Sequence, residues 1–267
     1  MKDLRAALRK FWSYTRFPRR YARTLLYFLW MMTFGLFERG TRARISEFSK
    51  EPPSRWLDWL RSKPKAAVTT ESPANLIPPI PLREVLGDSP DYSLFEPQAH
   101  PWNAPLLDVL ILGRLAARHQ PGTLFEFGTF DGRTSLNLIA NAGAAAHLYT
   151  IDIQKRECRF EQTPYAARIT RLIGDSRTYD FSPYLGKMNL VFVDADHNYK
   201  GVRHDSEVAL KLLGPQGGVV IWHDYGPGCW GVTQALNEFF TNDVRFASAR
   251  LVEETTLVVM PVGKMEL

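Results

Sequence analysis

The chain has 267 residues, of which 45% are hydrophobic and 23% charged, and its formal net charge is +5. This length and composition exclude a disordered chain and allow one sizeable core with a smaller region beside it. Two cysteines are too few for a disulfide framework and no cysteine–histidine cluster has zinc-site spacing, so we expect a reducing, cytoplasmic setting.

The positive charge is concentrated at the N-terminal end. Residues 1–65 contain 16 Lys and Arg against 5 Asp and Glu, whereas the remainder contains 17 against 23. Apolar residues recur at helical spacing in residues 4–12 and around Trp56, and the 14 residues 24–37 carry no charge. That run is shorter than the roughly 20 residues of a spanning helix.

We therefore expect residues 1–70 to form a basic, aromatic-rich helical arm. Such an arm favours peripheral contact with an anionic membrane surface, so a membrane-associated protein is expected. The alternative is that its helices pack on the rest of the chain or on a second subunit of a homo-oligomer. Nucleic acid is the weaker expectation, because no recognisable reading motif is present.

Four prolines in residues 72–81 predict a linker, which we place at residues 71–90 before a domain at 91–267. In that domain a helix is predicted at residues 106–119. Short apolar runs predict strands, and helical patterns lie between them at 134–141, near Tyr165 and at 199–213. The predicted strands are 123–127, 148–153, 170–173, 190–193 and 219–222. This alternation predicts a parallel sheet with both faces covered, and residues 245–251 and 256–261 predict an antiparallel hairpin at its edge.

A glycine-containing turn follows the first predicted strand. Its sequence is Phe125-Glu126-Phe127-Gly128-Thr129-Phe130-Asp131-Gly132. Glycines here let the backbone approach a ligand closely, and the next helix offers free N–H groups. The spacing is neither the dinucleotide fingerprint nor a P-loop. A tight turn without a ligand is the structural alternative.

Acidic residues follow the next two strands. Asp152 lies 26 residues after Glu126, where a carboxylate can accept from both hydroxyls of a ribose. Asp175, followed by Ser176, can accept from an adenine amino group. Each acid alone is more often a helix cap or a turn residue. Three acids in strand order at one sheet edge indicate a nucleoside site.

Together, the turn, Asp152, Gly174-Asp175-Ser176 and the loop at 213–218 resemble the motif series of the class I S-adenosylmethionine-dependent methyltransferases. Residues 193–202, with Asp205, are similar to a subgroup that includes small-molecule and sugar O-methyltransferases. The resemblance covers residues 91–261 and leaves the arm unexplained. It implies an α/β, Rossmann-like, doubly wound and mostly parallel seven-stranded sheet with a C-terminal antiparallel hairpin.

The resemblance also implies residue roles. Glu126, Gly128, Thr129 and Gly132 would hold the methionine and ribose portion of S-adenosylmethionine, with Asp194 beside them. Asp152 would bind the ribose diol, and Asp175 with Ser176 would flank the adenine. The glutamine at position 216 departs from the commoner Pro-Gly-Gly form of the loop, which is a minor departure.

For a hydroxyl acceptor, a general base and a divalent metal both assist methyl transfer. Asp194 and Asp224 follow neighbouring strands and match, by position, the metal-binding acids of catechol-type and macrolide-sugar-type enzymes, so a Mg²⁺ site is expected. His223 stands where the catechol type carries an acid. It can be a metal ligand, a base, or a partner of a ligand. His197 has the offset of the macrolide-sugar base, and the alternative is that it caps the following helix or binds Asp205.

The sequence thus predicts an S-adenosylmethionine-dependent methyltransferase acting on a hydroxyl of a small polar or sugar-like acceptor, assisted by a metal. Two alternatives stay open: a metal-free enzyme acting on nitrogen, carbon or a lipid, and a non-catalytic docking module. Tyr225, Cys229 and Trp230 follow the fifth strand, where they either line the acceptor site or serve packing. The acceptor itself is not identified by the residues, because fold does not determine function.

Overall fold

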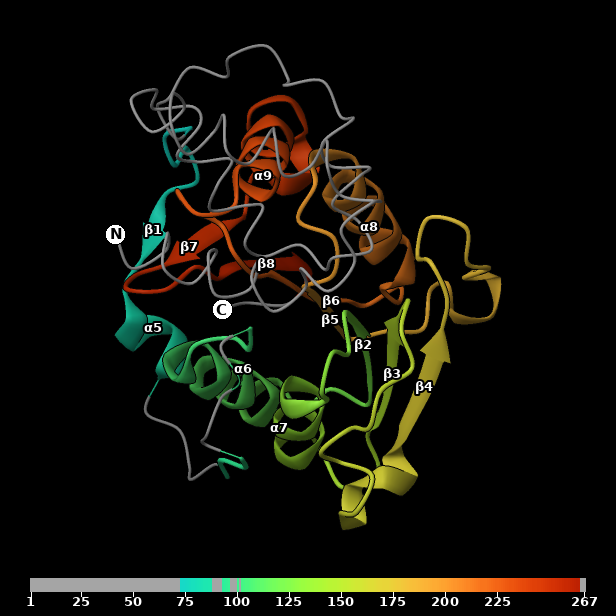
Figure 1. The fold of residues 1–267 in the computed structure, drawn as a ribbon. Helices are drawn as coiled ribbons and strands as arrows, with labels where there is room; N and C mark the ends of the chain where they lie inside the picture. Colours follow the sequence, from blue (N-terminus) through green and yellow to red (C-terminus); the bar gives the residue numbers. More distant parts are fainter. Residues whose placement is uncertain (1–72, 88–92, 97–99, 101, 265–267) are drawn as a thin grey trace, which may run out of the picture. The chain divides into compact units, whose positions relative to one another are not determined.

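The computed structural model describes residues 73–87, 93–96, 100 and 102–264, which all lie in the compact unit Ser72–Leu267. Its centre is a single eight-stranded sheet (Figure 1). The strands are β1 (Pro79–Ile80), β2 (Thr123–Phe127), β3 (His147–Asp152), β4 (Ile169–Ile173), β5 (Leu190–Val193), β6 (Gly217–Trp222), β7 (Arg250–Val252) and β8 (Val258–Gly263). Their order across the sheet is β1-β7-β8-β6-β5-β2-β3-β4.

Most of the sheet is parallel, as the alternation of elements predicts. Strand β2 pairs in parallel with β3 and β5, and the parallel pairing continues to β4 and β6 at either side. Strand β8 runs antiparallel to β6 and β7, which confirms the predicted C-terminal hairpin. The predicted seven strands are present, and β1 adds an eighth by pairing in parallel with β7.

Helices cover both faces of the sheet, because the side chains of successive strand residues point to opposite faces. Phe125 and Phe127 pack with α8 (Tyr199–Leu212) and α9 (Trp230–Asn242). Leu124 packs on the other face with α5 (Leu82–Leu86), α6 (Leu106–His119) and α7 (Arg133–Asn141). Figure 1 shows the two helix groups on opposite sides of the strands. Strands β2, β5 and β6 are apolar almost throughout because they are buried on both faces.

Three short 3-10 helices complete the described elements: η3 (Pro164–Arg168), η4 (Ser182–Tyr184) and η5 (Val244–Phe246). The helical pattern near Tyr165 is therefore only a 3-10 turn, begun by Thr163, whose side chain accepts from the Tyr165 N–H. The first hairpin strand starts later than residue 245, since η5 occupies that segment and the Asp243 side chain caps it.

Two stretches differ more strongly from the sequence-based expectation. Within the predicted linker, residues 73–87 contribute β1 and α5, with Val85 fully buried, so the prolines here shape an edge strand. The second difference is helix α9, which the sequence-based prediction does not include. Its buried residues, among them Val232, Leu236 and Phe239, recur at helical spacing and are the signal that could have revealed it.

The predicted basic arm at residues 1–70 lies outside the described residues, and so do its proposed membrane, subunit and nucleic-acid contacts. Across the described part of the chain, every helix falls short of the length and hydropathy that crossing a bilayer requires.

Candidate functional site

The candidate site lies along one edge of the sheet, where the parallel strands end. Phe127 is in register with Ile151 and Val193, and Val193 with Trp222. The residues that follow these strand ends therefore lie at one level: Asp152, Gly128, Asp194 and His223. Backbone bonds continue the pairing, because the Gly128 N–H donates to Ile151 over 2.8 Å and the Asp194 N–H to Phe127 over 2.9 Å. The predicted convergence of strand ends is thus present.

The glycine turn needs its glycines for reasons inside the protein. Gly128 has φ 96°, and a Cβ there would lie 2.1 Å from the Asp194 carbonyl oxygen. Gly132 has φ 75°, and a Cβ there would lie 2.6 Å from the Phe160 ring. Positive φ and these close approaches exclude larger residues at both positions. The turn therefore brings two loops together, whichever ligand it binds.

Glu126 points away from the edge, into the layer between the sheet and α7. It is fully buried and accepts from the hydroxyls of Ser135 and, over 2.6 Å, Thr150. Burial raises its pKa to about 8, although both hydroxyl donors oppose the shift. Thr129 is buried beside it, with its hydroxyl 2.7 Å from that of Thr150. Direct cofactor contact by Glu126 and Thr129 stays a prediction.

Asp152 joins the ends of β2 and β3. Its Oδ2 accepts from the Phe130 N–H over 2.8 Å, and its Oδ1 accepts from the Gln154 N–H over 2.8 Å. The carboxylate is therefore held at the edge by backbone donors on both sides. Charge-assisted bonds of this kind fix its orientation strongly.

The two residues predicted to flank an adenine follow β4. Asp175 accepts from the Arg177 guanidinium over 2.7 and 3.0 Å, and these bonds hold the pKa of Asp175 at about 2. The Ser176 carbonyl lies 3.0 Å from His204 Nε2 of α8. Both residues lie after the strand that neighbours β3, as predicted, and both already have partners within the chain.

The predicted metal ligands form a compact cluster after β5 and β6. His223 Nδ1 lies 3.2 Å from Asp194 Oδ1 and 3.4 Å from Asp224 Oδ1. One ligand atom from each of the three residues lies within 4.8 Å of the others. Asp224 has φ 62°, a left-handed conformation that costs a non-glycine residue about 1–2 kcal/mol. Its two carboxylate oxygens lie near the two histidines, Oδ2 by His197 and Oδ1 by His223.

His197 lies beside this cluster, and its ring contacts Asp224 and Asp194 rather than Asp205. Its Nε2 is 2.8 Å from Asp224 Oδ2 and 3.5 Å from Asp194 Oδ1. These two carboxylates raise the pKa of His197 to about 10 against the effect of burial. Burial disfavours ionised Asp194, but His223 and His197 outweigh it and hold the pKa of Asp194 at about 2. With no other cation present, His197 is therefore protonated at neutral pH.

Asp108 is a functional candidate that the sequence did not reveal. It lies on α6, is 2% exposed, and its Oδ2 is 3.0 Å from His223 Nε2. Burial opposes the charge on His223, yet Asp194 and Asp108 raise its pKa to about 11. Thr256 closes the group, with its hydroxyl 3.2 Å from Asp108. The available signal was an acid inside the apolar run Leu106-Leu107-Asp108-Val109.

A hollow beside the cluster is lined by residues of both strand ends and of the following helices, among them Asp194, Asp196, His197, Trp222 and His223. Asp196 orders the turn before α8, because its Oδ1 accepts from the Asn198 N–H over 2.9 Å. Tyr225 does not line this hollow; it is 1% exposed, and its hydroxyl bonds Asn237 and the Leu76 and Ile77 N–H groups. Packing is thus the role of Tyr225.

Comparison with known proteins finds similarity to methyltransferases around this edge. Residues 125–225 match the family model described as "Methyltransferase domain". The comparison with curated proteins gave no match. Among solved structures, the S-adenosylhomocysteine-bound methyltransferase PaMTH1 of Podospora anserina is 19% identical, with TM-score 0.51, over 61% of this chain and 80% of that one.

Two further structures are similar. The O-methyltransferase TomG of Streptomyces achromogenes, in complex with SAM, is 20% identical over 60% of this chain and 82% of its own, with TM-score 0.48. An O-methyltransferase of Bacillus cereus, in complex with SAH, is 18% identical over 64% and 84%, with TM-score 0.47. The family match spans the glycine turn, the strand-end acids and His223. Residues 125–225 are therefore similar to a methyltransferase domain, and the fold resembles that of PaMTH1.

Proposed function

We propose that this domain binds S-adenosylmethionine across the ends of β2, β3 and β4 and transfers its methyl group to a hydroxyl of a small polar or sugar-like acceptor. The observation that carries the proposal is the row of Asp152, Gly128, Asp194 and His223 at one level of the sheet edge, with His197 beside it. A nucleoside laid along the first half of this row brings its reactive end to the second half.

Methyl transfer forms a bond from the acceptor oxygen to the methyl carbon and breaks the methyl–sulfur bond. The hydroxyl proton must leave as the oxygen attacks, and His197 Nε2 is the proposed proton acceptor. Only the neutral imidazole can accept, whereas its present carboxylate partners keep His197 protonated by raising its pKa. The base role therefore requires that Asp194 and Asp224 engage another positive group when the site is loaded.

A divalent cation held by Asp194, His223 and Asp224 fits that requirement. Two carboxylates and one imidazole suit Mg²⁺ or Mn²⁺, and the imidazole widens the choice toward Fe²⁺. The contact between His223 Nε2 and buried Asp108 is typical of a metal-binding histidine, since a carboxylate there fixes the ring. A bound cation would supply Lewis acidity that lowers the pKa of the acceptor hydroxyl.

The metal-free alternative has one observation in its favour. Within the described cluster, His197 and His223 lie against three carboxylates, those of Asp108, Asp194 and Asp224, so that much of the negative charge is already balanced. Such an enzyme would rely on positioning the acceptor beside His197. It would transfer methyl groups equally well with and without a chelator.

The proposal is tested by incubating the full chain with methyl-labelled S-adenosylmethionine and a panel of hydroxyl acceptors that includes catechols and monosaccharides. Label transfer that EDTA abolishes and Mg²⁺ or Mn²⁺ restores is the expected result. Transfer indifferent to EDTA would select the metal-free alternative. Label on nitrogen or lipid acceptors alone would contradict the hydroxyl assignment.

For the arm we propose peripheral contact with an anionic membrane, on the strength of its 16 basic residues. Removal of residues 1–65 should release the protein from phosphatidylserine-containing liposomes while cofactor affinity stays unchanged. Equal cosedimentation of the intact and shortened chains would contradict this proposal and leave a partner subunit as the arm's contact.

A further inference from the structure

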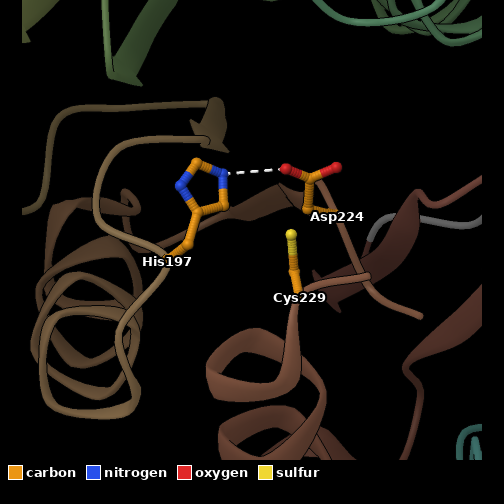
Figure 2. A group of neighbouring side chains, drawn as sticks. All are labelled: His197, Asp224 and Cys229. Atoms are coloured by element: carbon orange, nitrogen blue, oxygen red, sulfur yellow. Dashed lines mark ion pairs between the residues drawn. The ribbon is translucent and has the colours of Figure 1, made fainter. Parts of the chain in front are cut away.

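A second group of possible cation ligands lies next to the first, and its additional member is Cys229. Strand β6 is followed by the loop 223–229, and Cys229 is the residue that precedes α9. Figure 2 shows Cys229, His197 and Asp224 as neighbouring side chains, with the sulfur directed toward the other two. The three side chains come from three different parts of the fold: the turn before α8, the end of β6 and the start of α9.

The backbone holds Cys229 near His197. Gly231, in the first turn of α9, lies so close to the turn before α8 that a Cβ there would be 2.3 Å from the His197 carbonyl oxygen. The Thr233 hydroxyl accepts from the Gly226 N–H over 2.9 Å, so the loop is also fastened to α9. Both contacts hold the backbone of Cys229 close to that of His197, and neither depends on a ligand.

The donor atoms suit one cation. One atom each from His197, Asp224 and Cys229 lies within 4.8 Å of the others, and His197 Nε2 is 2.8 Å from Asp224 Oδ2. A tetrahedral ion bound at about 2.0–2.3 Å to such atoms needs them about 3–4 Å apart. His197 and Asp224 are partly exposed, which gives both side chains room to adjust.

This group is chemically different from Asp194, His223 and Asp224. The two oxygens of Asp224 divide between the groups: Oδ1 is 3.4 Å from His223 Nδ1, whereas Oδ2 faces His197. The first group has two carboxylates and suits a hard cation. The second contains a sulfur, and soft thiolate ligands select thiophilic ions over Mg²⁺.

We propose that His197, Asp224 and Cys229 form a second cation site that takes a thiophilic divalent ion of the Zn²⁺ type. Binding would release the thiol proton of Cys229 and the proton shared by His197 and Asp224 to solvent. Three protein ligands leave a fourth position for water. If His197 is the base of the proposed methyl transfer, the same ion occupies its Nε2 and inhibits the reaction. Only this consequence, and not the site itself, rests on the proposed function.

Co²⁺ is the probe, because a thiolate bound to it gives a sulfur-to-metal charge-transfer band that oxygen and nitrogen ligands do not give. The full chain is titrated with Co²⁺ in excess Mg²⁺ and in the absence of S-adenosylmethionine. The wild type should develop the band at one equivalent, and Cys229→Ser should lose it. Cys158→Ser is the matched control, since Cys158 is the other cysteine, is buried and should leave the band intact. His197→Gln should weaken Co²⁺ binding at least about tenfold.

Circular dichroism confirms that each variant is folded. Absence of the band in the wild type overturns the proposal, and so does a band that survives Cys229→Ser. Zn²⁺ displacing Co²⁺ with loss of the band supports the preference for a thiophilic ion, whereas displacement by Mg²⁺ alone contradicts it. None of these readouts involves methyl transfer, so failure here is distinguishable from failure of the proposed function.

Discussion

The two halves of the sheet edge are built in different ways. At the ends of β2, β3 and β4, each acid is held by donors close to it in sequence or on the adjacent strand: Asp152 by Phe130 and Gln154, Asp175 by Arg177. At the ends of β5 and β6, ionised groups bind one another, and His223 lies between Asp194 and Asp108. In the first half, the positions of the carboxylates are therefore set by nearby donors. In the second half, the arrangement depends on charged side chains from segments far apart in the sequence.

The difference fits two tasks of the proposed methyl transfer. Cofactor binding benefits from a rigid edge whose donors and acceptors are set before the ligand arrives. Proton removal needs groups whose charge can change, and a cluster of three carboxylates and two histidines provides them. We therefore expect substitutions in the first half to change affinity or stability, and substitutions in the second to change turnover.

The largest effect should come from His197→Gln, in the second half. Glutamine keeps a polar side chain near Asp224 but cannot accept the acceptor's proton, so kcat should fall by about 10²–10⁴-fold. Affinity for S-adenosylhomocysteine should stay within about twofold. Label transfer under saturating cofactor measures kcat, and a variant with near wild-type turnover would remove His197 as the base.

The next effect tests how Glu126 supports the first half. Burial raises the pKa of folded Glu126 to about 8 from the ordinary 4.5, so the native state holds its proton more tightly than the unfolded chain. The resulting stability is fully present below pH 4.5 and is lost as the pH rises through 8. Relative to Glu126→Gln, the wild type should lose a few kcal/mol between pH 5 and pH 8, because each pH unit in that interval lowers its free energy of unfolding by about 1.4 kcal/mol.

Urea unfolding at the two pH values measures this change. Glutamine is a suitable reference because its carbonyl can still accept from Ser135 and Thr150. Parallel pH profiles for the two proteins would show that Glu126 is ionised in the native state, contrary to the expectation.

A smaller loss is expected for Gly128→Ala. The added Cβ would lie 2.1 Å from the Asp194 carbonyl oxygen, and φ is 96°, so the turn must shift at a cost of about 1–3 kcal/mol. Gly228→Ala is the matched control, since a Cβ there meets nothing within 4 Å. Equal unfolding midpoints for the two variants would contradict the close approach between the two loops.

Asp108→Asn should have the smallest effect of the four. Asparagine leaves His223 in place but orients its ring less firmly, which typically lowers metal affinity about 10–100-fold. Calorimetric titration with Mn²⁺ measures the change, with Glu253→Gln, an exposed acid of the β7–β8 turn, as control. Unchanged Mn²⁺ affinity would mean that Asp108 only neutralises His223.

These two halves also differ in how far the sequence could predict them. The glycine turn, Asp152 and the order of the parallel strands follow from local patterns, because strand ends and turn residues lie within a few positions of one another. The meeting of Asp194, His197 and Asp224 follows from the same strand order. Resemblance to the methyltransferase family added roles that the residues alone do not supply.

What sequence reasoning missed depends on long-range contacts or on competing partners. Asp108 meets His223 across 115 positions, and β1 joins the sheet by pairing with β7. Glu126 belongs to the cofactor turn in sequence, yet its side chain points to Ser135 on α7. Helix α9 is hard to recognise because it begins at Trp230, directly after a segment with two glycines and a proline that is typical of a loop.

The most direct test of the central claim, a nucleoside cofactor on the first half of the edge, is calorimetric titration of the full chain with S-adenosylhomocysteine. The wild type should bind one equivalent. Asp152→Asn should bind about 10–100-fold more weakly, as expected for loss of hydrogen bonds to a charged acceptor, while Asp224→Asn should bind as the wild type does. Absence of binding at millimolar ligand, or equal affinity in the wild type and Asp152→Asn, would contradict the cofactor site placed here.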